Sequence, residues 1–168
     1  MEGSENKKIR VLILEDNPLD AELAERELKT IFKNYIFRVV DNKSDYLTSL
    51  NKFRPDLIIS DYQLPAFDGL SALKMAHQNL PFVPFIVLTG SINEETAVEC
   101  MKAGASDYVL KDHIVRLGST ILNVLERKNV EKEKFSAQQE LKERQEQLDA
   151  VFRYAPEPFY INNLKGVF

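Results

Sequence analysis

Three carboxylates follow two short apolar segments of this sequence. Glu15 and Asp16 come directly after residues 9–14, and Asp61 comes two residues after the run 57–59. Apolar runs of this length, bounded by turn residues, indicate buried parallel strands. Because ligands of open α/β sheets bind outside the carboxyl ends of the strands, these carboxylates are placed for chemistry. Taken alone, Asp61 is more simply explained as the start of a turn. Whether it has a chemical role therefore depends on the residues at the other strand ends.

Two further strand ends supply a hydroxyl group and a cation. The run 85–88 is followed by Thr89-Gly90, and the run 108–110 is followed by Lys111. Carboxylates that meet at one sheet edge repel one another unless a hard divalent cation or a cationic side chain lies among them, and Mg²⁺ suits oxygen ligands. A lysine and a threonine can also hold phosphoryl oxygens. Each residue alone has an ordinary explanation, but together they predict phosphoryl transfer.

Strand and helix signals alternate along residues 9–127, which must position these side chains. We expect strands at residues 9–14, 36–40, 57–59, 85–88 and 108–110, with helices between them. Asn17-Pro18, for example, supplies an N-cap and a proline at the first helical position. Five such units with short connections predict a doubly wound α/β fold, in which helices cover both faces of a five-stranded parallel sheet.

Charge and cysteine content restrict the classes of function. The net charge of −4 and the pI near 5.3 argue against a nucleic-acid-binding surface. The single cysteine, Cys100, excludes an internal disulfide framework, and we expect it to be buried rather than reactive. Because the sequence shows neither an apolar leader after Met1 nor a membrane segment, we expect a cytoplasmic protein.

Residues 9–127 resemble the response-regulator receiver domain of two-component signalling, a CheY-like, flavodoxin-like fold. The resemblance is carried by four motifs, the second of which is followed by Asp68-Gly69. They are Val-Leu-Ile-Leu-Glu-Asp-Asn (11–17), Asp-Leu-Ile-Ile-Ser-Asp-Tyr-Gln-Leu-Pro (56–65), Ile-Val-Leu-Thr-Gly (86–90) and Ala-Gly-Ala-Ser-Asp-Tyr-Val-Leu-Lys (103–111). Such domains are phosphoacceptor signalling modules, and their partners are histidine kinases or phosphotransfer domains.

The resemblance implies that Asp61 accepts a phosphoryl group from a phosphohistidine of the partner. It also implies that Asp16 and Asp61 ligate Mg²⁺ directly, together with the backbone carbonyl of Gln63, while Glu15 acts through water.

By the same resemblance, Lys111, Thr89 and the amide of Gly90 bind the phosphoryl oxygens, and Tyr108 turns inward when Thr89 moves. One departure concerns Asp112, where the family usually has a proline, often after a cis bond. This departure leaves phosphoacceptance intact. It bears on the geometry of the output surface, which comprises the helices before and after Tyr108.

Two other functions remain open. A phosphohydrolase that forms an aspartyl phosphate usually carries a second aspartate two residues after the nucleophile, and here that residue is Gln63. A pseudo-receiver would keep the fold as a protein-interaction module without phosphorylation. The presence of Asp16, Asp61, Thr89 and Lys111 argues against this alternative.

The remaining segments differ in composition from residues 9–127. Residues 1–8 are polar, and we expect them to be disordered. Residues 128–148 contain no Gly or Pro, which predicts a helical linker within one long helix from about His113 to Tyr154. Leu141 and Leu148 keep a seven-residue spacing, so a homodimer seam and a merely solvated helix are both open. Residues 149–168 resemble the start of a PAS sensor domain.

Overall fold

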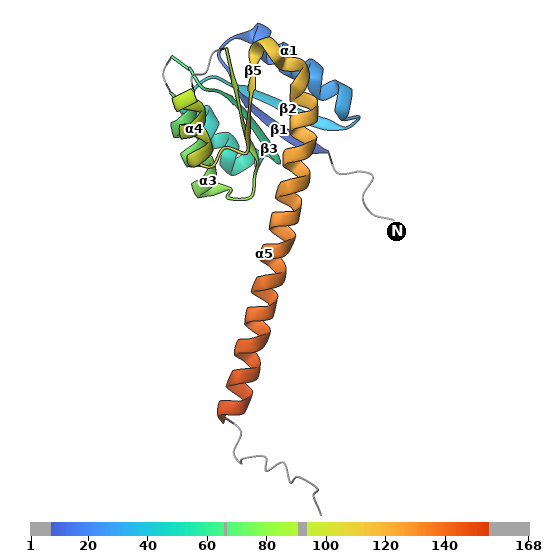
Figure 1. The fold of residues 1–168 in the computed structure, drawn as a ribbon, viewed down its shortest axis with the longest axis vertical. Coiled ribbons are helices and arrows are strands. Elements are labelled where there is room, and N and C mark those ends of the chain that lie inside the picture. The colour runs from blue at the N-terminus through green and yellow to red at the C-terminus, as the bar shows by residue number, and fades with distance from the viewer. Residues whose placement is uncertain (1–7, 66, 91–93, 155–168) are drawn as a thin grey trace, which may run out of the picture. The chain divides into compact units, whose positions relative to one another are not determined.

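The predicted five-stranded parallel sheet is confirmed in the computed structural model, which describes residues 8–65, 67–90 and 94–154. The strand order is β2-β1-β3-β4-β5, and every neighbouring pair is parallel (Figure 1). The strands are β1 (Ile9–Leu14), β2 (Tyr35–Val40), β3 (Leu57–Asp61), β4 (Phe85–Thr89) and β5 (Asp107–Leu110). Since β1 and β3 occupy central positions, their carboxyl ends lie side by side at one edge of the sheet.

Helices cover both faces of the sheet. They are α1 (Pro18–Ile31), α2 (Lys43–Thr48), α3 (Gly69–Asn79), α4 (Glu94–Lys102) and α5 (Leu117–Tyr154), with a π-helical turn at Ser49–Phe53 and a 3₁₀ helix at Lys111–Arg116. One core joins a sheet face to α2, α3 and α4, and includes the buried Cys100. The other core joins the opposite face to α1 and to the first turns of α5.

Alternation along β1 shows why its residues 11–14 are all apolar. Val11 and Ile13 pack in the core under α1 and α5, whereas Leu12 and Leu14 pack in the core under α2 and α3. Successive side chains of a strand point to opposite faces, so a strand covered on both faces needs apolar residues at every position.

The start of the last helix differs from the sequence prediction. The chain leaves β5 through the 3₁₀ helix, in which His113 has the non-helical angles φ −118° and ψ 35°, and α5 begins at Leu117 rather than near His113. The described residues contain no cis peptide bond, so the bond before Asp112 is trans.

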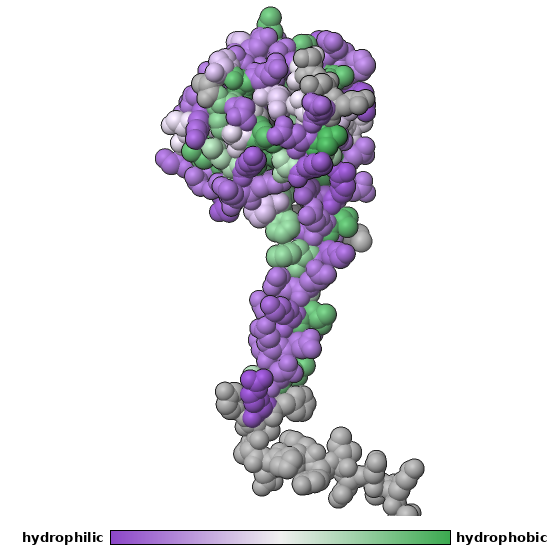
Figure 2. All heavy atoms as spheres, turned by 60° about the vertical axis from the view of Figure 1, so that its left-hand side comes forward, coloured by the Kyte–Doolittle hydropathy of each residue, from purple (hydrophilic) through white to green (hydrophobic). Residues whose placement is uncertain are grey.

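The chain divides into two compact units, residues 1–131 and 132–168. Helix α5 continues into the second unit as far as Tyr154, and Figure 2 shows hydrophobic side chains along it among hydrophilic ones. Two predicted segments lie largely outside the described residues. They are the N-terminal segment 1–8, of which only Lys8 is described, and the part of the PAS-like segment beyond Tyr154. Within the described part of the chain, no helix is both long and apolar enough to cross a membrane.

Candidate functional site

The ammonium group of Lys111 lies among three carboxylates at the carboxyl edge of the sheet. Its Nζ atom is 2.7 Å from Oδ2 of Asp61, 2.7 Å from Oδ2 of Asp20 and 2.8 Å from Oε2 of Glu15. Asp61 ends β3, Glu15 follows β1, and Lys111 follows β5. The structure therefore brings together three side chains that the sequence placed at separate strand ends. It adds Asp20, from the first turn of α1, which the sequence analysis did not identify.

Burial sets the electrostatics of this cluster. Glu15 is 3% exposed and Asp61 is 8% exposed. Burial raises the pKa of Glu15, and the hydrogen bonds from Lys111 and from the amide of Asn17 oppose only part of that effect. Burial alone would lower the pKa of Lys111, but hydrogen bonds to Asp20, Asp61 and Glu15 outweigh it and raise that pKa. The lysine therefore stays charged, and the buried glutamate is the less favourably ionised partner.

A second grouping of carboxylates suits a metal ion. Glu15, Asp16 and Asp61 each offer one oxygen, and these oxygens lie within 4.8 Å of one another. The Oε2 atom of Glu15 is buried, and the ammonium group of Lys111 lies 2.8 Å from it. An all-oxygen donor set of two buried carboxylates and one exposed carboxylate fits a hard divalent cation such as Mg²⁺.

Local backbone structure fixes the direction of Asp61. Its Oδ1 atom accepts a hydrogen bond of 3.0 Å from the amide of Gln63, whose side chain is exposed. Helix α3 starts against the same segment, where the Gly69 amide donates to the carbonyl of Tyr62. A Cβ atom at Gly69 would lie 2.6 Å from the carbonyl oxygen of Asp61. Asp68 therefore caps α3, and Gly69 allows the helix to approach Asp61 closely.

Thr89 is the last residue of β4, the strand next to β3, and Gly90 follows it. Asp61 pairs with Leu88 across β3 and β4, so Thr89 lies one residue beyond that pair, at the same sheet edge. The side chain of Thr89 is buried, whereas Gly90 is exposed and has nothing near the position of an added Cβ.

Tyr108 lies on β5, the strand that precedes Lys111. Its side chain is 39% exposed. It lines a shallow, mostly apolar groove with four residues of α4, namely Ala97, Val98, Met101 and Lys102. The sequence-predicted aromatic residue thus faces outward in this structure.

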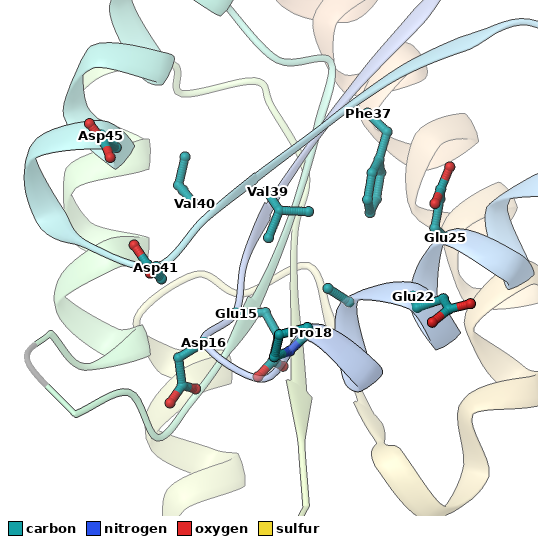
Figure 3. A pocket seen from close by; sticks show the side chains of 11 residues that line it. Glu15, Asp16, Pro18, Glu22, Glu25, Phe37, Val39, Val40, Asp41 and Asp45 are labelled. Atoms are coloured by element: carbon teal, nitrogen blue, oxygen red, sulfur yellow. The ribbon is translucent and has the colours of Figure 1, made fainter.

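Glu15, Asp16 and Asp61 are called the metal-type group below. An acidic groove of about 450 Å³ opens beside this group (Figure 3). Val39, Val40 and Phe37 of β2 form its apolar wall, and Glu22 of α1 lies on the opposite side. Its other lining residues are Glu15, Asp16, Pro18, Ala21, Glu25, Asp41 and Asp45. Asp16 is the exposed member of the metal-type group, so this groove gives solvent and ions access to it.

Comparison with known proteins agrees with this geometry. The family model described as the response regulator receiver domain matches residues 11–122. The transcriptional regulatory protein PhoP of Escherichia coli (strain K12) is 34% identical over 125 residues, which cover 72% of this chain and 53% of PhoP. The DNA-binding transcriptional regulator NtrC of Proteus hauseri is 36% identical over 74 residues, which cover 44% of this chain and 16% of NtrC.

Solved structures show the same fold. The Mn²⁺-bound form of the response regulator Rcp1 is 25% identical, with a TM-score of 0.57, and the match covers 66% of this chain and 90% of that one. A CheY-like receiver domain protein from Methanospirillum hungatei JF-1 is 24% identical, with a TM-score of 0.66, and covers 74% of this chain and 99% of that one.

The match to the family model extends over more than half of the chain, and it coincides with the sheet, the acidic cluster and the lysine described above. The chain belongs to the response regulator receiver domain family. It is a receiver domain of two-component signalling, followed by a helical extension. It spans 53% of PhoP and 16% of NtrC, so the activities of those whole proteins do not transfer to it.

Proposed function

We propose that Asp61 is the phosphoacceptor of this receiver domain and that a histidine kinase or phosphotransfer protein is its donor. The observation that carries the proposal is the ion pair of 2.7 Å between Asp61 and Lys111, within a buried carboxylate cluster at the ligand-binding edge of the sheet. A carboxylate held in this way is fixed in position.

In the proposed reaction, a carboxylate oxygen of Asp61 forms a bond to phosphorus while the P–N bond of the donor phosphohistidine breaks. The leaving imidazole nitrogen keeps the electron pair of that bond. Lys111, the hydroxyl of Thr89 and the amide of Gly90 would then hold the phosphoryl oxygens, as in the family that the chain belongs to.

Glu15, Asp16 and Asp61, with the carbonyl of Gln63, would hold Mg²⁺. When bound, this ion supplies positive charge that offsets the charge of the transferring phosphoryl group. The Mn²⁺ in the related Rcp1 structure supports a divalent cation in such a domain. Tyr108 would turn inward with Thr89 after phosphorylation, which would change the face formed with α4.

The experiment that tests the acceptor is the substitution Asp61→Asn. In the presence of Mg²⁺ and acetyl phosphate, the unaltered chain should gain one phosphoryl mass in intact-mass spectrometry, and Asp61→Asn should gain none. Asp112→Asn, at an exposed aspartate next to Lys111, serves as the control and should be phosphorylated normally. A phosphorylated Asp61→Asn variant would place the acceptor elsewhere, and an unreactive unaltered chain would favour a pseudo-receiver.

We also propose a domain arrangement for a longer, cytoplasmic signalling protein such as a hybrid sensor kinase. Residues 9–127 form the receiver, residues 128–148 a helical linker, and residues 149–168 the start of a PAS domain. The linker would join two copies in a parallel homodimer. The exposed apolar residues of α5 support this proposal, since they gain burial in such a seam.

A further inference from the structure

Asp20 contacts the site lysine as closely as the proposed phosphoacceptor does. Its Oδ2 atom lies 2.7 Å from Nζ of Lys111 and accepts a hydrogen bond from it, the same distance that separates Lys111 from Asp61. Asp20 differs from the other carboxylates in origin, because it belongs to the first turn of α1 rather than to a strand end. It is also outside the metal-type group of Glu15, Asp16 and Asp61.

A short network fixes the position of Asp20. The amide of Asn17 donates to Oε1 of Glu15 over 3.1 Å, and the side-chain amide of Asn17 donates to Oδ2 of Asp20 over 3.1 Å. The side-chain oxygen of Asn17 accepts from the amide of Leu19 and so caps α1. A carboxylate in the first turn of a helix also lies in the favourable field of the helix dipole. Asp20 is therefore held by the helix start and not by the lysine alone.

The three carboxylates around Lys111 differ in what else they are proposed to bind. An ammonium group has three N–H donors. It faces three carboxylates, namely Glu15, Asp20 and Asp61. A divalent cation held by the metal-type group would compete for the charge of Glu15 and Asp61. A phosphoryl group on Asp61 would take that carboxylate away from the lysine. Asp20 belongs to neither the metal-type group nor the acceptor, so its contact with Lys111 is removed in neither case.

We infer that Asp20 is a positioning residue for phosphoryl transfer, which holds the ammonium group of Lys111 beside Asp61 from the α1 side. This inference rests on the proposed function of Asp61 and extends it to a residue outside the strand ends. Without Asp20, Lys111 loses one of its charge-assisted hydrogen bonds and its ammonium group moves more freely at the mouth of the site.

The first measurement needs neither metal nor phosphate. In a ¹⁵N-labelled, Mg²⁺-free chain, the ammonium signal of Lys111, assigned by its absence in Lys111→Met, should exchange with water slowly. Asp20→Ala should raise that exchange rate about tenfold, the factor that corresponds to one hydrogen bond to a charged group. Asp20→Asn, which keeps the shape of the side chain, should give a smaller increase. Glu22→Ala is the matched control, because it removes an exposed carboxylate of α1 that lines the acidic groove without contacting Lys111.

The second measurement is the initial rate of phosphorylation by acetyl phosphate at saturating Mg²⁺. Asp20→Ala should slow it about tenfold, which corresponds to the loss of one hydrogen bond to a charged group. Asp20→Asn should slow it less, and Asp20→Glu should recover part of the rate. Glu22→Ala should match the unaltered chain. An unchanged Lys111 exchange rate in Asp20→Ala, or a slowing shared equally by Glu22→Ala, would overturn the inference. If the unaltered chain accepts no phosphate, the proposed function fails, whereas the exchange rates still decide whether Asp20 positions Lys111.

Discussion

Lys111 supplies a single positive charge to Glu15, Asp20 and Asp61, so the ionised cluster keeps a negative excess. Buried charges are costly unless they are paired, and removal of one partner from a buried pair typically costs more than the pair itself contributes. The lysine is therefore a structural residue in the metal-free chain as well as a proposed ligand of the phosphoryl group.

The substitution Lys111→Met should reduce the free energy of unfolding by about 3–5 kcal/mol at pH 7 in Mg²⁺-free buffer, because it leaves buried carboxylates without their cation. The pH dependence follows from Glu15, whose pKa burial already raises above the ordinary 4.5. Loss of Lys111 raises it further, so the folded variant binds more protons than the unfolded chain above pH 4.5. Stability is then lost as the pH rises through the raised pKa and recovered as the pH falls toward 4.5.

Urea unfolding between pH 4.5 and pH 8 measures this effect, with Lys74→Met, at an exposed lysine of α3, as the control. A loss of stability in Lys111→Met that is equal at every pH in this range would contradict the electrostatic explanation.

The substitution Asp16→Ala should weaken Mg²⁺ binding at least about tenfold and abolish phosphorylation at low millimolar Mg²⁺. Asp16 is the exposed carboxylate of the metal-type group, and its loss removes both an oxygen ligand and a charge. Calorimetric titration with Mg²⁺ measures the affinity, and Asp41→Ala, in the same acidic groove but outside that group, is the control. Equal affinities of Asp16→Ala and the unaltered chain would exclude Asp16 as a ligand.

At the residue scale, the sequence predicted the carboxylates and the lysine that follow strands, because parallel strands bring their carboxyl ends to one edge. It did not predict Asp20 as a member of the cluster. Its contact with Lys111 depends on how α1 is rotated over the sheet, and a helical pattern does not specify that rotation to within one hydrogen bond. The steric role of Gly69 was missed for a similar reason, since it depends on the distance between α3 and the backbone of Asp61.

At the scale of elements, the end of α4 illustrates a glycine that the backbone requires. Gly104 has φ +100°, and the amides of Gly104 and Ala105 donate to the carbonyls of Met101 and Cys100. This is the arrangement of a helix that ends in the left-handed region. An added Cβ atom at Gly104 would also clash with Cε1 of His77, which α3 presents to this turn.

The substitution Gly104→Ala should therefore lower the free energy of unfolding by about 1–3 kcal/mol, since an alanine is strained at this φ and displaces the imidazole ring. Gly90→Ala is the matched control, because an added Cβ there meets no atom within 4 Å. Thermal unfolding followed by circular dichroism compares the two variants. A Gly104→Ala variant as stable as Gly90→Ala would show that the turn relaxes without cost.

Helix boundaries were predictable where capping residues mark them and less so elsewhere. Asn17-Pro18 marks the start of α1, and Gly104 marks the turn that follows α4. The start of α5 was placed too early, because the residues of the 3₁₀ helix have helical propensity and no breaker separates them from Leu117. Only the backbone angles of His113 reveal the interruption.

At the scale of the whole molecule, α5 leaves large apolar side chains exposed. Beyond the first compact unit they are Phe135, Leu141, Leu148 and Val151, with exposures between 45% and 67%. The doubly wound sheet was fully predictable from the alternation of strands and helices, whereas the partner of this helix was not, because a sparse apolar stripe fits both a solvated helix and a dimer seam.

We expect the 168-residue chain to be a dimer and a chain truncated after Glu131, which keeps the first compact unit, to be a monomer that still accepts phosphate on Asp61. Multi-angle light scattering and intact-mass spectrometry measure the two properties. Leu141→Lys is a control that shortens nothing and should weaken the dimer if α5 forms the seam. A full-length chain that stays monomeric at high micromolar concentration, with and without phosphodonor, would show that the helix is only a tether.

Strand β3 lies between β1 and β4, and all five of its residues are buried. Amide hydrogens of such a strand exchange with deuterium only through the largest cooperative opening of a domain. The proposed phosphoacceptor is thus attached to a strand of the stable core. An acyl phosphate on Asp61 would therefore decay by hydrolysis within the folded site rather than through opening of β3.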